Sequence, residues 1–324
     1  MIITPSELLN WIKTEKIFSV VDLRPKKLQS KDQLLGVQDR LSNSKVIPSV
    51  KSDLVLICQY GIVTEGIILE KGLTNSYSLL GGAEAWNHFY KNDSDFSKYS
   101  RQTILPEIGL DGQNKIINSK VAIIGMGGVG CPASQSLVAA GVGHLKIIDG
   151  DKVEISNLHR QPLYNYDDIG YSKVFVSKNK LKKQNKNTVI EPFDCFFDIS
   201  NAEKILNDVD VIIDATDNYV SRIKIDNASK RLNIPMIYGG LHRYEGHVSV
   251  FNFNNGPSYV DIFPKPNENE DNCNMAGTLG MLTGIIGNIQ ALEAIKIVTG
   301  IDNNLSGKLL IYNTLSHELT KIEL

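Results

Sequence analysis

The sequence predicts an α/β protein of two domains, and three observations lead to this prediction. The 324 residues exceed what one hydrophobic core usually holds, because such cores stop growing near about 250 to 300 residues. Apolar runs of strand length alternate with helical patterns, first over residues 5–71 and again over 121–252. The third observation is a polar stretch between these two regions, which indicates a linker between two domains. Since alternating strands and helices form a mostly parallel sheet covered on both faces, we expect this architecture in the larger domain.

The first domain is expected over residues 1–92 as a small α/β unit. Its predicted elements are helices at 5–13 and 63–71 and strands at 18–22 and 54–58. The polar stretch 87–100 interrupts this rhythm and is the predicted linker. The second domain is therefore expected over 93–324.

The second domain is predicted to begin with a strand that ends in glycines. Short aliphatic runs predict strands at 121–125, 145–149, 209–214, 236–239 and 247–252. Helical patterns between and after them lie at 131–140, 202–207, 219–231 and 278–300. The first of these helices consists mainly of small residues, and the last has the composition of a buried helix.

Composition and charge exclude several classes of protein. Hydrophobic residues make up 42% of the chain and charged residues 22%, which is typical of a globular protein and not of a disordered or fibrous one. The 34 basic and 36 acidic residues give a net charge of −2, which offers no bulk attraction for nucleic acid or acidic membranes. No signal-peptide pattern opens the chain, and no continuous apolar run is as long as a membrane span. We therefore expect a cytoplasmic protein without nucleic-acid or membrane partners.

The glycine-rich segment after the first strand of the second domain predicts a nucleotide site. It runs Gly125-Met126-Gly127-Gly128-Val129-Gly130 and opens a helix, and Asp149 closes the next strand 19 residues later. Glycines let the backbone approach a phosphate, amides at the helix N-terminus bind its charge, and the acid can accept ribose hydroxyls. This pattern by itself favours NAD over ATP.

The residues that follow change this interpretation. Asp151, the run Ser156 to Gln161 with Asn157 and Arg160, and Lys173 place two cations within 25 residues of Asp149. Hydride transfer does not need these cations, whereas polyphosphate chemistry does. The segment Asp214-Ala215-Thr216-Asp217-Asn218 then ends a predicted strand at the edge where open α/β sheets bind ligands. An acid at this edge can hold magnesium.

At this point the sequence resembles the ThiF/MoeB-type adenylyltransferases, which are relatives of ubiquitin-activating enzymes. The resemblance covers nearly everything from about residue 97 onward. Its motifs are Tyr99-Ser100-Arg101-Gln102, Gly125 to Gly130, Ser156 to Gln161, Gly170-Tyr171-Ser172-Lys173, Thr216-Asp217-Asn218, Glu245-Gly246-His247 and Gln290 to Lys296. The resemblance implies a Rossmann-like adenylation domain, preceded by the smaller α/β domain.

The resemblance also implies an activity and its residues. Members of the family use ATP and Mg²⁺ to adenylate the C-terminal glycine of a small ubiquitin-fold sulfur carrier, before thiocarboxylate formation. Carried over by motif, the residues that contact ATP or its metal would be Gly128, Asp149, Asn157, Arg160, Lys173 and Asp217. Around them we expect Gly125, Gly127, Gly130, Asp151, Ser156 and Asn218 in the nucleotide site. Asp217 would hold magnesium, and Arg101 would reach the site of the neighbouring subunit of a homodimer.

These residue types agree with the chemistry of adenylation. A carboxylate that attacks the α-phosphorus brings two anions together and expels pyrophosphate, so cations must stabilise the transition state. Arg160, Lys173 and Arg101 can neutralise this charge, and no protein nucleophile is required.

The four cysteines, at positions 58, 131, 195 and 273, are far apart and contain no C-x-x-C pair. Cys131 and Cys195 are expected in the core. Cys273 lies in a polar segment where the resembling family carries a cysteine for covalent linkage to the carrier or for sulfur transfer, although nearby acidic residues would raise its pKa. Many members hold a structural zinc with two C-x-x-C pairs. This chain has Ser258-Tyr259-Val260-Asp261 at the first pair, so we expect no structural zinc.

The first domain resembles a rhodanese domain. The resemblance rests on Val21-Asp22-Leu23-Arg24, on residues Val55 to Gly61 with Cys58, and on Leu80 to Trp86. Rhodaneses carry sulfur on a persulfidated cysteine at the end of a strand, and Cys58 matches that position. The following loop lacks the usual arginine, the domain is abbreviated, and relatives usually carry it after the adenylation domain. A sulfurtransferase with Cys58 as sulfur carrier and a degenerate docking domain both stay open.

Several interpretations of function stay open at this stage. The carrier would be of the MoaD or ThiS type and end in Gly-Gly, with molybdopterin or thiamine biosynthesis as the pathway and a cysteine desulfurase as a sulfur donor. The alternatives are an NAD-dependent oxidoreductase, a tRNA-modifying adenylating dehydratase of the same family, and a non-catalytic module that binds ubiquitin-like proteins. The dehydrogenase would leave Arg160, Lys173 and Asp217 without a role. The tRNA enzyme would need a basic patch that this chain lacks.

Overall fold

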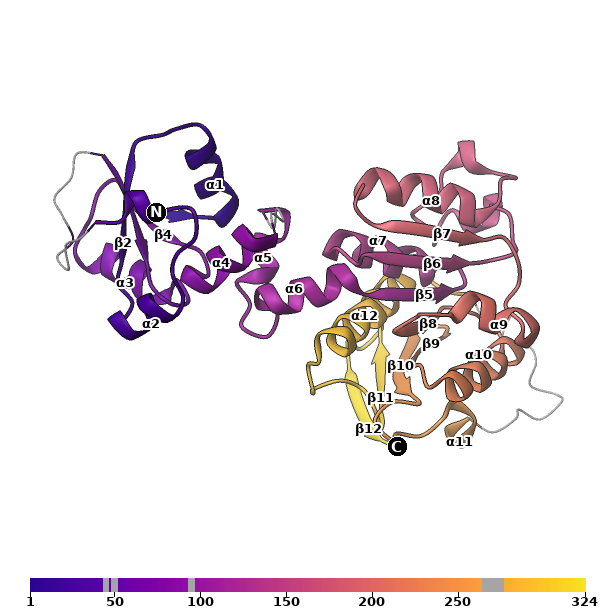
Figure 1. Ribbon diagram of the computed structural model, residues 1–324. Helices are drawn as coiled ribbons and strands as arrows, with labels where there is room; N and C mark the ends of the chain where they lie inside the picture. The colour runs from indigo at the N-terminus through magenta and orange to yellow at the C-terminus, as the bar shows by residue number, and fades with distance from the viewer. Residues whose placement is uncertain (43–46, 48–51, 93–96, 264–276) are drawn as a thin grey trace. The chain divides into compact units, whose positions relative to one another are not determined.

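The protein is described by a computed structural model that covers residues 1–42, 47, 52–92, 97–263 and 277–324. The chain folds into two compact units, unit 1 (Met1–Gln113) and unit 2 (Asn114–Leu324) (Figure 1). Each unit has its own sheet and is described by itself. The domain boundary at 92/93 inferred from the sequence stays a prediction.

Unit 1 contains a four-stranded parallel sheet with the strand order β1-β4-β3-β2. The strands are β1 (Ile2–Ile3), β2 (Phe18–Asp22), β3 (Asp53–Ile57) and β4 (Ser76–Leu79), and the helices among them are α1 (Pro5–Lys13), α2 (Lys26–Lys31), α3 (Ile62–Glu70) and α4 (Gly82–Asn92). Helix α1 begins at a capping box, because Thr4 and Glu7 each accept a hydrogen bond from the other's backbone N–H. The predicted strands and helices of this unit are confirmed to within one residue.

The predicted linker at 87–100 is wrong in its first part, because residues 87–92 continue helix α4. The side chains of this helix are held from unit 1 itself. Trp86 is fully buried and its indole Nε1 donates to the carbonyl of Leu35 at 2.6 Å. The amide of Asn87 accepts from Leu35 N and donates to the carbonyl of Gln33. The polar side chain of Asn87 is therefore buried, although the composition of this stretch indicated a linker.

The helical segments η2 (Ser97–Tyr99), α5 (Ser100–Thr103) and α6 (Gly109–Asn118) lead into unit 2. Its sheet has eight strands in the order β12-β11-β10-β9-β8-β5-β6-β7. The strands are β5 (Lys120–Ile124), β6 (His144–Ile148), β7 (Val189–Phe193), β8 (Val211–Asp214), β9 (Met236–His242), β10 (Glu245–Phe251), β11 (Lys308–Asn313) and β12 (Leu319–Glu323). Strands β7, β6, β5, β8 and β9 are parallel, and β10 to β12 extend the sheet antiparallel.

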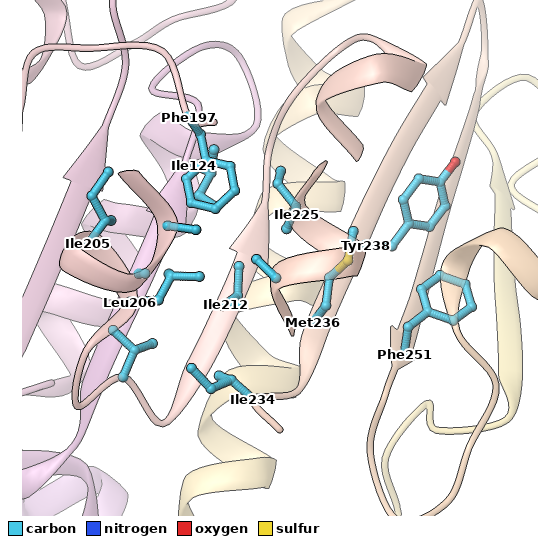
Figure 2. Packing of buried hydrophobic residues seen from close by; sticks show 14 of the residues in the cluster. Ile124, Phe197, Ile205, Leu206, Ile212, Ile225, Ile234, Met236, Tyr238 and Phe251 are labelled. Carbon is cyan, nitrogen blue, oxygen red and sulfur yellow. The ribbon is translucent and has the colours of Figure 1, made fainter. Parts of the chain in front are cut away.

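The helices of unit 2 pack on both faces of this sheet. They are α7 (Gly130–Ala140), α8 (Lys173–Gln184), α9 (Ile199–Leu206), α10 (Tyr219–Leu232), α11 (Tyr259–Ile262) and α12 (Gly280–Thr299). Helix α12 packs against α7, β8, β9 and β10. A second layer, formed by α9 and α10, buries an aliphatic cluster that includes Ile205, Ile225 and Met236 (Figure 2). This is the doubly wound α/β arrangement that the alternating pattern predicted.

Helix α12 is, among the described residues, the one helix long and apolar enough to cross a membrane by length and composition, although no continuous apolar run suggested it in the sequence. Its surroundings explain its composition. It packs against three strands, and the buried amide of Gln290 donates to the carbonyls of Asp214 and Ile237. Buried Glu293 accepts from Leu305 N at 2.8 Å. These contacts are those of a core helix.

Residues 258–261, where the resembling family would place its first C-x-x-C pair, begin helix α11. Ser258 Oγ donates to the carboxylate of Asp261 at 2.6 Å, and its backbone N–H donates to the same oxygen. Tyr259 lies within an aromatic group that also contains Tyr238, Phe251 and Phe263. This corner of unit 2 is therefore packed with rings around a capped turn.

Candidate nucleotide-binding site

The sheet of unit 2 brings three predicted segments to one edge. Ile124 at the end of β5 pairs with Ile148 of β6 on one side and with Asp214 of β8 on the other. The chain leaves β5 at Gly125 and leaves β6 at Asp149. Strand β5 therefore lies between its successor β6 and the much later β8, so the strand order reverses here. Open α/β sheets bind their ligands in the crevice at such a point.

The glycine loop makes a tight turn from β5 into helix α7. Gly125 has a φ of +99°, which residues with a Cβ rarely adopt. Gly130 lies so close to Gly125 that a Cβ on it would be 2.0 Å from the Gly125 carbonyl oxygen. The helix has no side-chain N-cap, since its N-cap residue is Val129. Its N-terminal amides can thus bind an anion from the cavity.

Asp149 is a buried carboxylate that holds this loop. One oxygen accepts from Met126 N at 2.7 Å and the other accepts from Asp151 N at 2.8 Å. Burial raises the pKa of the Asp149 carboxyl, and the nearby Lys173 ammonium and the two amides oppose this increase. A carboxylate can accept about four hydrogen bonds, so Asp149 can still accept hydrogen bonds from the hydroxyl groups of a sugar.

Lys173 is the first residue of helix α8, and its side chain is buried in the cavity wall. Its Nζ lies 2.9 Å from the carboxylate of Asp151 and 4.0 Å from that of Asp149. The backbone N–H of Lys173 also donates to the carbonyl of Asp151. The chain after β6 therefore turns back so that a cation lies beside the acid.

The segment between β6 and α8 supplies a second cation. A 3₁₀ turn (Ile155–Asn157) buries the side chain of Asn157, and Arg160 Nη1 donates to the carbonyl of Ser156 at 2.9 Å. The Arg160 side chain is half-buried and lines the cavity. Ser156 is exposed and does not line the described cavity, so its contribution here is its backbone carbonyl.

The predicted acidic segment follows β8 as a structured loop. Asp214 is fully buried, and one of its oxygens accepts from the amide and the hydroxyl of Thr216 at 3.0 and 2.6 Å. Asn218 is the N-cap of α10, where its side chain accepts from Ser221 N and donates to Asp217 at 3.3 Å. Asp217 lies on the cavity wall, between Thr216 and Asn218, which these hydrogen bonds hold in place. Its exposed carboxylate can meet a ligand because Asp214 carries the structural contacts.

A cavity of about 540 Å³ joins these segments. Ten of the twelve residues that we expected at the nucleotide line it: Gly125, Gly127, Gly128, Asp149, Asp151, Asn157, Arg160, Lys173, Asp217 and Asn218. Gly130 and Ser156 are outside its wall. A cavity of this size suits a nucleotide.

Other residues of the cavity wall were not expected from the sequence. The most informative is Arg222, whose Nη2 donates to the carbonyls of Thr216 and Gly239 and whose Nε lies 3.6 Å from Asp214 Oδ2. Leu241 lines the cavity because β9 continues past the end of β8, and Arg243, which also lines the cavity, directly follows β9. The rule that ligands bind at the carboxyl ends of strands could have pointed to Leu241 and Arg243. Arg222, one helical turn after Asn218, carried no sequence signal of its own.

Four other residues that the sequence singled out, Arg101 and three cysteines, are not among these ten. Arg101 belongs to helix α5 of unit 1, whereas the cavity lies in unit 2. Cys273 lies outside the described residues. Cys131 is fully buried behind the glycine loop, as expected, and burial raises its pKa to about 12. The prediction that Cys195 belongs to the core is wrong in part, because this residue is only partly buried and lines the cavity.

Cys58 lies at the end of β3 in unit 1, where the loop turns back over its thiol. Gly61 N donates to Cys58 Sγ at 3.1 Å, and Thr64 Oγ1 lies 3.6 Å from the sulfur. Burial alone would raise the pKa of this thiol, but hydrogen bonds from Thr64 and from the loop amides outweigh it, so the pKa lies below its usual value. The side chain of Val63 is exposed beside it.

Together the doubly wound sheet, the glycine loop and the cavity define a nucleotide-binding α/β domain. More specifically, the chain belongs to the ThiF family, whose model matches residues 99–324. A protein of Porphyra purpurea named probable molybdopterin-synthase adenylyltransferase is 43% identical over 233 residues, which are 70% of this chain and 61% of that protein. A protein of Drosophila sechellia named adenylyltransferase and sulfurtransferase MOCS3 is 43% identical over 228 residues, 70% of this chain and 50% of the relative.

Solved structures share the fold. A crystal structure of PaaA is 29% identical, with a TM-score of 0.60 over 70% of this chain and 73% of that one. A crystal structure of Escherichia coli MccB is 22% identical, with a TM-score of 0.62 over 74% and 75% of the two chains. At this low identity the likeness to MccB concerns the fold alone. The match with the two curated relatives spans 61% and 50% of their lengths.

Proposed function

We propose that the protein uses ATP to adenylate the C-terminal glycine of a small ubiquitin-fold sulfur carrier. The observation that carries this proposal is the joint presence of Lys173, Arg160 and Asp217 in the same cavity as the glycine loop. A polyphosphate needs cations and amide donors, and these come from four segments that the sheet brings together. Membership of the ThiF family and the names of the relatives support the same conclusion.

In the proposed reaction a carboxylate oxygen of the carrier attacks the α-phosphorus of ATP. The bond between the α-phosphorus and the bridging oxygen breaks, and pyrophosphate leaves with its electron pair. The products are an acyl-adenylate and pyrophosphate. Amides of the glycine loop and the side chains of Arg160 and Lys173 would lower the free energy of the transition state, because they line the cavity proposed to hold the phosphates and can offset the negative charge that accumulates on the phosphate oxygens. Asp149 orients the sugar.

Magnesium fits the residues that are present. The described residues contain no cluster of three or more His, Cys, Asp or Glu side chains that could hold a metal by themselves. Mg²⁺, however, is commonly bound by one or two carboxylates together with substrate phosphates and water. Asp217, exposed on the cavity wall, can supply such a carboxylate. When bound, the metal would neutralise phosphate charge.

The names of the relatives support our proposal for the carrier and the pathway. Their names favour molybdopterin biosynthesis for this chain, and a thiamine role is the second candidate of the same chemistry. We infer that the carrier ends in Gly-Gly, that a cysteine desulfurase or a similar donor supplies sulfur, and that Cys273 takes part after adenylation. We also infer a cytoplasmic homodimer in which Arg101 completes the site of the partner subunit.

Unit 1 is proposed to be a rhodanese-like domain in which Cys58 carries sulfur. The support is geometric: a thiol at the end of a parallel strand accepts a hydrogen bond from a loop amide, and its pKa is lowered. The loop after Cys58, residues 61–64, contains no arginine. Amide donors can bind an anionic persulfide without that arginine. A docking module without sulfur chemistry is the alternative.

The decisive experiment is carrier-dependent exchange of labelled pyrophosphate into ATP. Asp217→Asn should reduce this exchange at least about 100-fold, because a single transition-state contact is worth roughly 3 kcal/mol. Asp167→Asn is the matched control, since Asp167 is an exposed acid outside the cavity wall. Normal exchange by the Asp217 variant would refute the metal assignment. Binding of NADH instead of ATP would favour the oxidoreductase interpretation.

A further inference from the structure

Two neighbouring phenylalanines follow strand β7 and face opposite ways. Phe197 is buried in the aliphatic cluster beneath α9 (Figure 2). Phe196 is 70% exposed and lines the cavity. A large apolar side chain exposed to water at a cavity wall loses hydrophobic stabilisation, which a planar apolar ligand would restore. None of the roles described above uses this ring.

The backbone around Phe196 is fixed. Asn201 Nδ2 donates to the carbonyl of Phe196 at 2.9 Å. Asp198 is the N-cap of helix α9, where it accepts from Ser200 N, and it also forms an ion pair with Lys224 at 2.8 Å. Phe196 is thus held between a buried neighbour and a helix cap. Its ring is presented to the cavity from a preorganised loop.

The ring of Phe196 lies flat on Gly150. A Cβ built on Gly150 would be 2.9 Å from Cδ2, 2.9 Å from Cε2 and 3.1 Å from Cγ of this ring. Three consecutive ring carbons at nearly equal distances mean that Gly150 faces the ring plane and not its edge. One face of the ring therefore covers a backbone without a side chain. Since the residue is largely exposed, the opposite face is open.

We propose that this open face of Phe196 is the platform on which the nucleobase stacks. Gly150 directly follows Asp149, the residue that can accept the sugar hydroxyls, so a base attached to that sugar lies beside the ring. The glycine loop and Lys173 line the same cavity and can receive the phosphates. Aromatic rings stack on the π-face of any base, which gives affinity for a nucleotide over free polyphosphate. This inference rests on the proposed function.

The test compares two ligands by calorimetry, ATP and inorganic tripolyphosphate. Phe196→Ala should weaken ATP binding roughly 5- to 100-fold, the effect of one base stacked on an aromatic ring. Tripolyphosphate, which has no base, should bind the variant as it binds the wild type. Phe196→Tyr should retain ATP binding. Gly150→Ala should weaken ATP binding, because the new methyl group displaces the ring. Phe175→Ala, which removes an exposed ring outside the cavity wall, is the control.

Three results would overturn the inference alone. The first is a folded Phe196→Ala protein that binds ATP as tightly as the wild type. The second is an equal loss of ATP and tripolyphosphate binding, which would mean that the substitution disturbs the whole cavity. The third is a wild-type protein that binds tripolyphosphate but gains nothing from the base and sugar of ATP. If the wild type binds neither ligand, the proposed function fails first.

Discussion

Replacing Arg222 by Met should destabilise unit 2 by about 3 to 5 kcal/mol, the usual effect of removing one partner from a buried ion pair. The substitution leaves the carboxylate of Asp214 fully buried and without its cation. It also removes the donor to the carbonyls of Thr216 and Gly239. Met keeps most of the apolar volume of the side chain, so the loss reports the charge and the hydrogen bonds.

The magnitude translates into a measurable shift in urea. Unit 2 comprises residues 114–324, and a domain of that size has a denaturant slope of about 3 kcal/mol/M or more. Dividing about 3 to 5 kcal/mol by this slope gives a midpoint lower by about 1 to 1.7 M. Arg231→Met on the same helix is the control, because Arg231 pairs with Glu203 on the surface at 3.5 Å. Such exposed pairs contribute about 0 to 1 kcal/mol.

The positions of the tryptophans make the assay specific. The chain has two, Trp11 and Trp86, and both belong to unit 1. Tryptophan fluorescence therefore reports unfolding of unit 1, whereas far-UV circular dichroism reports both units. The Arg222→Met transition should move in circular dichroism and stay in place in fluorescence. A midpoint within about 0.3 M of the wild type in both signals would refute the reasoning.

The same variant has a pH dependence of known sign. Burial raises the pKa of the Asp214 carboxyl, and the Arg222 cation opposes this increase, so removing the cation raises the pKa further. An acid whose pKa is higher in the folded state loses stability as the pH rises from its unfolded value, about 3.9, through its folded value. The destabilisation by Arg222→Met should therefore be larger at about pH 8 than at about pH 5. The opposite trend would mean that Asp214 is not the charge left unpaired.

Three further predictions concern the cysteines and the subunits. Alkylation of Cys58 by iodoacetamide, followed by peptide mass spectrometry, should have a midpoint at a lower pH than alkylation of a cysteine in an unstructured peptide, whereas Cys131, with a pKa of about 12 and no exposure, should stay unmodified in the native protein. A Cys58 midpoint at or above that of the peptide would contradict the amide contacts. Cys273→Ser should leave pyrophosphate exchange unchanged and lower the thiocarboxylate yield, measured by the intact mass of the carrier; loss of exchange would remove the separation of the two steps. Mixing Arg101→Ala with Asp217→Asn protein should restore part of the exchange, and no recovery after verified subunit exchange would exclude shared sites.

Sequence patterns were sufficient to predict the parts of the site that depend on neighbouring residues in the chain. The glycine loop follows β5 because aliphatic residues form a buried strand and glycines then turn the chain. Asp149 and the segment from Asp214 to Asn218 were found because each ends a strand, and parallel strands end at one edge. These signals are local. The resemblance to the family came from the same ordered motifs and was confirmed by the family match.

Which other residues line the cavity depends on the way the strands and helices pack in three dimensions. Arg222 and Phe196 are ordinary in sequence, and they reach the cavity because the order β7-β6-β5-β8 brings the ends of distant segments together. Whether a polar residue faces water is also decided in three dimensions: Asn87 bonds to the backbone of Leu35, so a polar stretch continues a helix. Patterns of neighbouring residues in the sequence specify the helices, the strands and the residues at which the strands end. Side-chain burial and orientation depend on which elements become neighbours, and this information is distributed over the whole chain.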